Sequence, residues 1–168
     1  IVSTSGNSGI SLGYYAKKTG VDLYVLTGEK CDPGKLEAMR KNCAHLYISK
    51  NPARICNYIS AKYGFKNLRP SMDDTAVTGF ENLGREIYEQ FAELRSAGKI
   101  QEFWQKIYSF VTSGASYIGM YKAFSALYEK GAIKAVPKMN MVTGFAGRMG
   151  VKNLPRQKQI NEIMEKTG

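Results

Sequence analysis

The feature that most constrains this fold is a regular alternation of short apolar segments with helical segments over residues 1–64. Each apolar segment is rich in aliphatic residues, and the segment after it carries apolar residues at helical spacing. Such a strand–helix repeat predicts parallel strands with helices packed on the sheet. We expect strands at 1–2, 21–27 and 44–49, and helices over 10–18, from Asp32 and from Asn51, with Gly20 and Gly64 at helix ends and Pro33 and Pro52 at helix starts.

Residues 65–77 are polar and irregular, which predicts a crossover between two lobes. The fold class predicted for the whole chain is α/β with three layers, in which mostly parallel, twisted sheets have flanking helices. The lobes are a small βα lobe at 1–66 and part of a large lobe at 67–168. In the second lobe we expect helices at 78–96, around Phe103 and Trp104, at 117–130 and at 156–166, strands at 107–112 and 138–143, and a loop at 144–155.

The chain is strongly basic, because 24 Lys and Arg residues against 14 Asp and Glu residues give a formal net charge of +10. A basic excess attracts anions, including phosphorylated metabolites and nucleic acid. Here the basic residues are spread along the chain, and no zinc-finger or RNA-binding motif accompanies them. We therefore expect no nucleic-acid partner.

Composition also limits membrane, metal and thiol chemistry. No apolar run reaches the roughly 18 residues of a membrane span, and the chain opens without a basic and apolar leader. Cys31, Cys43 and Cys56 lack C-x-x-C spacing, which is typical of reduced cytosolic thiols. His45 is the only histidine, so any site that needs two histidines is excluded. These features predict a cytoplasmic protein with no metal and no membrane partner.

Two strand-to-helix turns consist of small polar residues, at Ser3–Gly9 and at Thr112–Ser116. In a parallel α/β sheet such turns collect free N–H groups and the positive end of a helix dipole, so either could bind a carboxylate or phosphate. Their hydroxyl and amide side chains supply no general base. Neither turn matches the P-loop pattern or G-x-G-x-x-G. Two ordinary βα turns remain an open alternative.

The two turns carry a resemblance to a known family. Ser3–Gly9 resembles the S-[ST]-G-N-[ST] loop of fold-type II pyridoxal-phosphate enzymes, the tryptophan synthase β-like superfamily. Thr112–Ser116 falls where that family has its glycine-rich phosphate loop. Residues 79–90 and 121–139 are similar to segments of threonine synthases within this superfamily. The four motifs occur in the family's order over nearly the whole chain.

The resemblance implies pyridoxal 5'-phosphate as cofactor and a role for each matched residue. Asn7 matches the asparagine that hydrogen-bonds the phenolic oxygen of the cofactor. The cradle for the cofactor phosphate matches Ser113, Gly114, Ala115 and Ser116. The residues that match the grip on the substrate carboxylate are Thr4, Ser5, Gly6 and Ser8.

The sequence departs from the family in three places. Thr112 and Ala115 stand where the phosphate loop usually carries glycine, and Arg69-Pro70 replaces an Asn-Pro pair usual in threonine synthases. No lysine lies at the position of the family's Schiff-base lysine, which is upstream of the asparagine loop. We therefore leave the catalytic residue unassigned and expect the chain to be a central fragment of a longer parent chain.

The resemblance implies a pyridoxal-phosphate-dependent amino-acid lyase or synthase similar to threonine synthase, which converts O-phosphohomoserine to threonine and phosphate. Two alternatives stay open. One is a cysteine synthase or a serine/threonine dehydratase, and the other is a non-catalytic protein that keeps the fold. The partners implied are a small amino-acid substrate, the remainder of the parent chain and, as an open alternative, a second copy in a homodimer.

Overall fold

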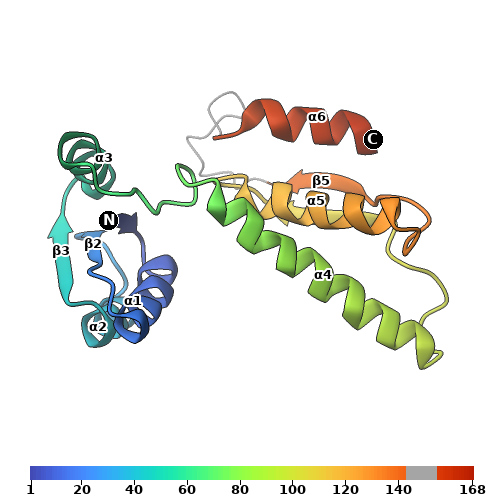
Figure 1. Cartoon of the computed structure of the whole chain (residues 1–168), viewed down its shortest axis with the longest axis horizontal. Helices are drawn as coiled ribbons and strands as arrows, with labels where there is room; N and C mark the ends of the chain where they lie inside the picture. The colour runs from blue at the N-terminus through green and yellow to red at the C-terminus, as the bar shows by residue number, and fades with distance from the viewer. Residues whose placement is uncertain (143–154) are drawn as a thin grey trace. The chain divides into compact units, whose positions relative to one another are not determined.

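The computed structural model describes residues 1–142 and 155–168. They form two compact units, residues 1–72 and 73–168, coloured blue to green and green to red in Figure 1. The sequence pattern places the division at residue 66, but the next residues still contact the first unit. The N–H of Leu68 donates to the carbonyl of Ile1 at 2.9 Å, and the amino group of Ile1 donates to the carbonyl of Lys66 at 2.9 Å.

The first unit contains the strand–helix repeat that the sequence predicts. Its three strands are parallel and lie in the order β1-β2-β3, with Val2 opposite Val25 and Leu26 opposite Tyr47. Strand β2 begins three residues later than expected, because the N–H of Val21 still donates to Ala16 at the end of a helix. The elements are β1 (Val2–Thr4), α1 (Asn7–Thr19), β2 (Tyr24–Gly28), α2 (Pro33–Asn42), β3 (His45–Ser49) and α3 (Pro52–Tyr63).

Helices cover both faces of this sheet. Val25 and Leu26 are successive residues of β2, so their side chains point to opposite faces. Val25 packs with Met39 and other residues of α1 and α2, whereas Leu26 packs with Cys56 of α3. Figure 1 shows α1 and α2 on one side of the strands and α3 on the other. The predicted three-layer, parallel α/β architecture is confirmed in this unit.

The second unit is built from helices packed on a small parallel sheet. Strands β4 and β5 pair with Ser109 opposite Met141. One apolar core joins the helices to the sheet and includes Val77, Phe124, Met139 and Ile160. The elements are α4 (Thr75–Ser96), β4 (Lys106–Phe110), α5 (Ala115–Glu129), β5 (Lys138–Val142) and α6 (Gln157–Thr167). The predicted loop at 144–155 lies almost wholly outside the described residues.

The helix predicted around Phe103 and Trp104 is wrong, because residues 101–105 form bends and irregular chain. The two aromatic side chains pack on helices that lie elsewhere in the sequence. Trp104 meets the ring of Phe91 on α4 and the ring of Phe124 on α5, with centroids 4.6 and 5.4 Å away. Phe103 stacks on Tyr88 of α4 at 5.6 Å. Tertiary packing of a loop therefore produces the apolar pattern that suggested a helix.

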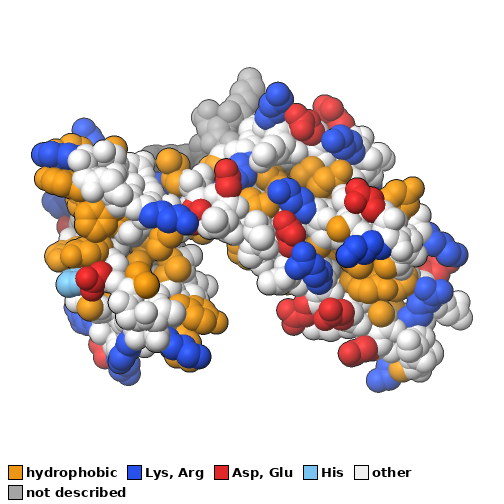
Figure 2. Space-filling view, viewed as in Figure 1, with side chains coloured by type: hydrophobic (Ala, Val, Ile, Leu, Met, Phe, Trp, Pro, Cys, Tyr) orange, Lys and Arg blue, Asp and Glu red, His pale blue; other side chains and the backbone are white. Residues whose placement is uncertain are grey.

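The surface agrees with the spread of charge along the sequence. On the face drawn in Figure 2, Lys and Arg side chains are distributed over both units and alternate with Asp and Glu. Within the described residues, no helix combines the length and apolar character needed to cross a bilayer.

Candidate cofactor site

The first turn joins the end of β1 to the start of α1, and Thr4 organises it. The hydroxyl oxygen of Thr4 accepts from the N–H of Gly6 at 3.1 Å and from the N–H of Gly9 at 3.4 Å. The next two N–H groups, of Asn7 and Ser8, belong to the first helical turn and have no acceptor within that helix. Asn7 is exposed and Ser8 half-buried. The turn therefore presents two N–H groups and a side-chain amide.

Neighbouring side chains leave no space at the glycines of this turn. A Cβ atom on Gly9 would lie 2.6 Å from Sδ of Met39 and 2.7 Å from Cγ2 of Thr4, and one on Gly6 would meet the side-chain carbons of Lys35. The alkyl chain of Lys35, in the first turn of α2, thus packs against the first turn. Sequence reasoning missed Lys35, because its contact with Gly6 joins two segments that are distant in the sequence. The N–H of Lys35 donates to the cap Asp32 at 3.0 Å.

Two thiols also contact this region. Sγ of Cys31 lies 3.6 Å from the carbonyl oxygen of Ser5, and Sγ of Cys43 lies 3.6 Å from that of Gly9. Burial raises the pKa of the Cys43 thiol, and burial also raises the pKa of the Cys56 thiol on the buried face of α3. The thiols of Cys43 and Cys56 are therefore protonated at neutral pH. Within the described ranges no group of three or more His, Cys, Asp and Glu residues could hold a metal ion.

The second turn joins β4 to α5 and has the same design. Gly114 lies in the left-handed region at φ +77°, which a residue with a side chain rarely adopts. A Cβ atom there would lie 3.0 Å from Cδ1 of Ile160. The hydroxyl oxygen of Ser113 accepts from the N–H of Ala115 at 3.3 Å. Ser116 is half-buried in the first turn of α5, where its N–H has no acceptor within the helix.

The two unusual residues of this turn fit a phosphate. Ala115 is fully buried and belongs to the apolar core of its unit, so its methyl group points into the protein. Thr112 is exposed at the first position of the turn. The methyl group of Ala115 therefore does not point toward an anion placed at the N–H groups that begin α5. The residues present therefore suit an anionic group at the start of α5.

Arg156 stabilises this turn through a hydrogen bond to the backbone, and sequence reasoning identified Arg156 only as a helix start. Its guanidinium donates from Nη1 to the carbonyl of Ser113 at 2.9 Å and from Nη2 to the carbonyl of Asp73 at 3.2 Å. It also donates to Oδ1 of Asp74, from Nη2 at 2.9 Å and from Nε at 3.2 Å. Asp74 is separated from Arg156 by 82 residues, so no local pattern could have shown the contact.

The structure thus brings the predicted residues together in two sets. The first turn, in the unit of residues 1–72, contains Thr4, Ser5, Gly6, Asn7 and Ser8. The second turn, in the unit of residues 73–168, contains Ser113, Gly114, Ala115 and Ser116.

A parallel α/β fold whose strands lead into anion-binding helix starts defines a class of proteins that hold anionic ligands at strand ends. The chain belongs to the pyridoxal-phosphate dependent enzyme family, whose profile matches residues 1–162. The predicted fold-type II family and its cofactor, pyridoxal 5'-phosphate, are confirmed. The family match does not specify a substrate. No curated protein sequence matches the chain at a significant level.

Solved structures show the same fold at low sequence identity. O-ureido-L-serine synthase is 17% identical with a TM-score of 0.66, and the match covers 88% of this chain and 45% of that one. The threonine deaminase of T.th. is 22% identical with a TM-score of 0.65, covering 86% and 44%. Escherichia coli diaminopropionate ammonia lyase is 14% identical with a TM-score of 0.67, covering 84% and 39%. The chain thus spans less than half the length of these proteins.

Proposed function

We propose that these residues belong to a pyridoxal-phosphate-dependent lyase or synthase whose substrate is a small amino acid. The observation that carries the proposal is the pair of strand-to-helix turns, Ser3–Gly9 and Thr112–Ser116, each of which offers N–H groups to an anion. The family match supports the cofactor. Within the family we propose the reaction of threonine synthase, from O-phosphohomoserine to threonine and phosphate, on the strength of the similar segments 79–90 and 121–139.

In this proposal the first turn holds the ring of the cofactor and the carboxylate of the substrate. Asn7 donates from its side-chain amide to the phenolic oxygen of the ring. Ser5, Gly6 and Ser8 border the substrate carboxylate, for which the N–H of Ser8 is a suitable donor. Thr4 acts by fixing the turn, because its hydroxyl already accepts from Gly6 and Gly9.

The second turn holds the cofactor phosphate. The N–H groups of Gly114 and Ser116 donate to it, and the dipole of α5 favours its charge. Ser113 fixes the turn through Ala115, and the methyl group of Ala115 anchors it to the core. When bound, the cofactor supplies an electron sink for reactions at the substrate α-carbon. The chain's own residues supply binding, orientation and the electrostatic environment.

The chain is much shorter than the solved structures that share its fold, which supports a longer parent chain. The lysine that binds the cofactor covalently lies in a longer parent chain, of which residues 1–66 and 67–168 form parts of the small and large lobes. The short span relative to O-ureido-L-serine synthase supports this proposal. Unpaired cysteines support a cytoplasmic protein. We also propose a homodimer.

A second candidate function is that of a cysteine synthase or a serine/threonine dehydratase. The fold shared with threonine deaminase supports it, at 22% identity. Arg69-Pro70, which departs from the threonine synthase pattern, supports it as well. Turnover of O-phosphohomoserine, O-acetylserine and threonine by the full-length protein distinguishes these reactions.

The first prediction tests the cofactor and Asn7 together. Full-length protein incubated with pyridoxal 5'-phosphate and then dialysed to remove the free cofactor should retain a visible absorbance band. Asn7→Ala should weaken cofactor affinity by about tenfold, because a hydrogen bond to the ring oxygen is lost. Asn51→Ala is the matched control, since Asn51 is an exposed asparagine at the start of α3 whose side chain makes no cap hydrogen bond.

The outcomes separate the two parts of this prediction. A wild-type protein without any absorbance band would favour the non-catalytic alternative over an enzyme. A normal wild-type band with equal affinities for the Asn7 and Asn51 variants would remove Asn7 from the cofactor site.

A further inference from the structure

The side chain of Arg156 makes polar contacts to the second turn and to the two residues that precede α4. Its side chain is only 9% exposed, although it carries a permanent charge. Its donors reach two backbone carbonyls and one carboxylate, on Ser113, Asp73 and Asp74. The guanidinium therefore connects the phosphate turn, the start of α4 and the start of α6, which are three separate segments of the sequence.

The backbone of Arg156 is also unusual. Its φ is +61°, and among the described residues it is the only non-glycine residue with positive φ. For a residue with a Cβ atom this conformation is strained, and such strain persists where surrounding contacts fix it. The carbonyl of Arg156 still accepts the first helical bond of α6, from Ile160 at 3.0 Å. The Cβ atom of Arg156 would lie 3.6 Å from a Cβ atom added to Gly114, and the carbonyl oxygen of Pro155 would lie 3.3 Å from that added atom, so the backbone at this point also lies against the second turn.

The contact with Ser113 acts on a specific peptide group. The carbonyl that accepts from Arg156 belongs to the peptide whose N–H is that of Gly114. In a planar trans peptide the carbonyl and the N–H point in opposite directions. Because the carbonyl of Ser113 points toward the guanidinium, the N–H of Gly114 points away from it. A charged donor on the carbonyl also polarises the peptide and strengthens the N–H as a donor.

We infer that Arg156 is a positioning residue for the cofactor phosphate, acting through the Ser113–Gly114 peptide and held in turn by Asp74. The inference rests on the proposed function, because it requires that the second turn bind the phosphate of pyridoxal 5'-phosphate. Arg156 does not touch the phosphate. It fixes the orientation of the N–H group that does, and its charge makes that group a better donor.

The test compares two ligands that differ only in the phosphate. Dissociation constants are measured for pyridoxal 5'-phosphate and for pyridoxal on the full-length wild type, Arg156→Gln and Arg156→Lys. Arg156→Gln should reduce the preference for the phosphorylated ligand by about tenfold. Arg156→Lys should reduce it less, because the charge remains but the fork of donors is lost. The ³¹P resonance of the bound cofactor should move toward that of free pyridoxal 5'-phosphate in Arg156→Gln.

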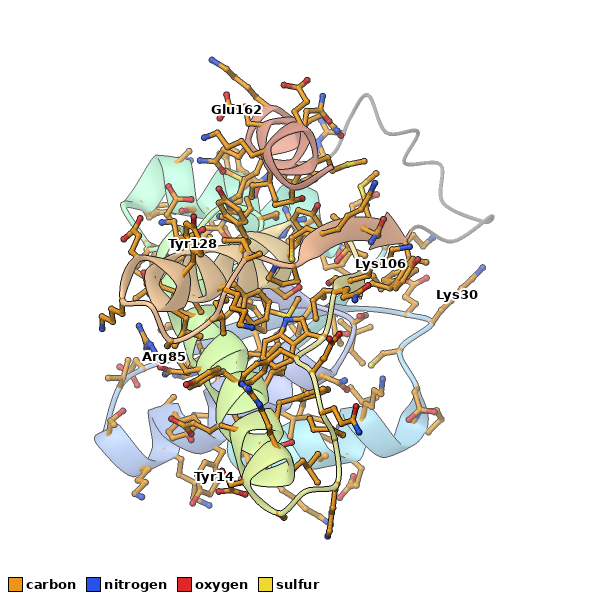
Figure 3. The ribbon with its side chains drawn as sticks, turned by 90° about the vertical axis from the view of Figure 1, so that its right-hand side faces the viewer. Tyr14, Lys30, Arg85, Lys106, Tyr128 and Glu162 are labelled. Atoms are coloured by element: carbon orange, nitrogen blue, oxygen red, sulfur yellow. The ribbon has the colours of Figure 1, made fainter. Side chains whose placement is uncertain are left out.

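Arg85→Gln is the matched control. Arg85 also pairs with an acid, Glu81 at 3.1 Å, but it lies on the surface of α4 (Figure 3) and does not contact the second turn. The preference of this variant for the phosphorylated ligand and its ³¹P resonance should equal those of the wild type. A loss of the same size in Arg85→Gln would overturn the inference.

The remaining outcomes are also decisive. An unchanged preference in folded Arg156→Gln would overturn the inference and leave Arg156 a structural brace. If Arg156→Gln does not fold, Asp74→Ala replaces it, since the Asp74 side chain is 94% exposed and its loss removes the carboxylate that holds the guanidinium in place. An unchanged preference there would overturn the inference too. Failure of the wild type to bind pyridoxal 5'-phosphate would overturn the proposed function, and this inference with it.

Discussion

Tyr117 is the residue whose burial has the clearest consequence for stability. Its ring is fully buried in the second unit, and its hydroxyl donates to the carbonyl of Met139 at 2.9 Å. Burial raises the pKa of Tyr117 from 10.0 to about 12. In the unfolded chain the phenol regains its ordinary pKa. Between pH 10 and 12 the unfolded state therefore loses this proton first, and the free energy of unfolding falls as pH rises.

Tyr117→Phe tests this at the level of one hydroxyl group. At pH 7 the variant should lose about 1 kcal/mol of unfolding free energy, because the carbonyl of Met139 loses its donor. The difference from wild type should shrink above about pH 10, since the variant has no proton to lose. Urea unfolding between about pH 7 and 11.5 measures both effects. Tyr108→Phe, at a largely exposed tyrosine of β4, should match wild type throughout. A difference that stays constant with pH would contradict the role of Tyr117.

Local sequence signals account for the elements that were predicted correctly. Pro33 and Pro52 begin α2 and α3, and Gly20 and Gly64 end α1 and α3, because each acts on its own turn of backbone. The same local reasoning identified the small polar residues of the two turns. It could not identify Arg156, whose partner Ser113 is 43 residues away.

The error around Trp104 has the same cause as the omission of Arg156. An apolar pair reads as part of a helix when only neighbours in sequence are considered. The ring of Trp104 in fact packs on Phe91 and Phe124, which the sequence does not show to be near. Elements follow from local backbone preferences, whereas the contacts that complete a site depend on how distant segments meet.

At the scale of elements, the pair of α4 and α5 depends on a glycine at their contact. A Cβ atom on Gly84 of α4 would lie 2.6 Å from Cβ of Ala123 and 3.2 Å from the backbone of Met120, both on α5. Gly84→Ala should therefore force the helices apart and cost about 1–3 kcal/mol of unfolding free energy. Gly79 lies on the same helix with nothing within 4 Å of an added Cβ atom.

Gly79→Ala is thus the matched control, and it should raise the unfolding free energy by about 0.5–1 kcal/mol through helix propensity alone. Thermal and urea unfolding of both variants measure the two effects. Equal changes of the same sign would show that helix propensity, and not the close approach of α4 and α5, determines the outcome.

At the scale of the molecule, the described residues of the second unit place helices on only one face of its parallel sheet. Ile107, Met139 and Met141 point to the core shared with the helices. The alternate residues Tyr108 and Phe110 are 68% and 60% exposed, and Lys106 begins the same row (Figure 3). Parallel sheets are normally covered on both faces. The first unit follows that rule, since α1 and α2 cover one face of its sheet and α3 the other.

This contrast leads to the last prediction. We expect further elements of the proposed parent chain to cover the face that carries Phe110. In the full-length protein Phe110→Glu should then cost at least about 2 kcal/mol of unfolding free energy, because it removes buried apolar area and buries an unpaired charge. Tyr128→Glu, on an exposed position of α5 (Figure 3), should change it by less than about 0.5 kcal/mol. If Phe110→Glu were tolerated equally well, this face would be in contact with solvent, and the parallel sheet of the second unit would be complete with helices on one side.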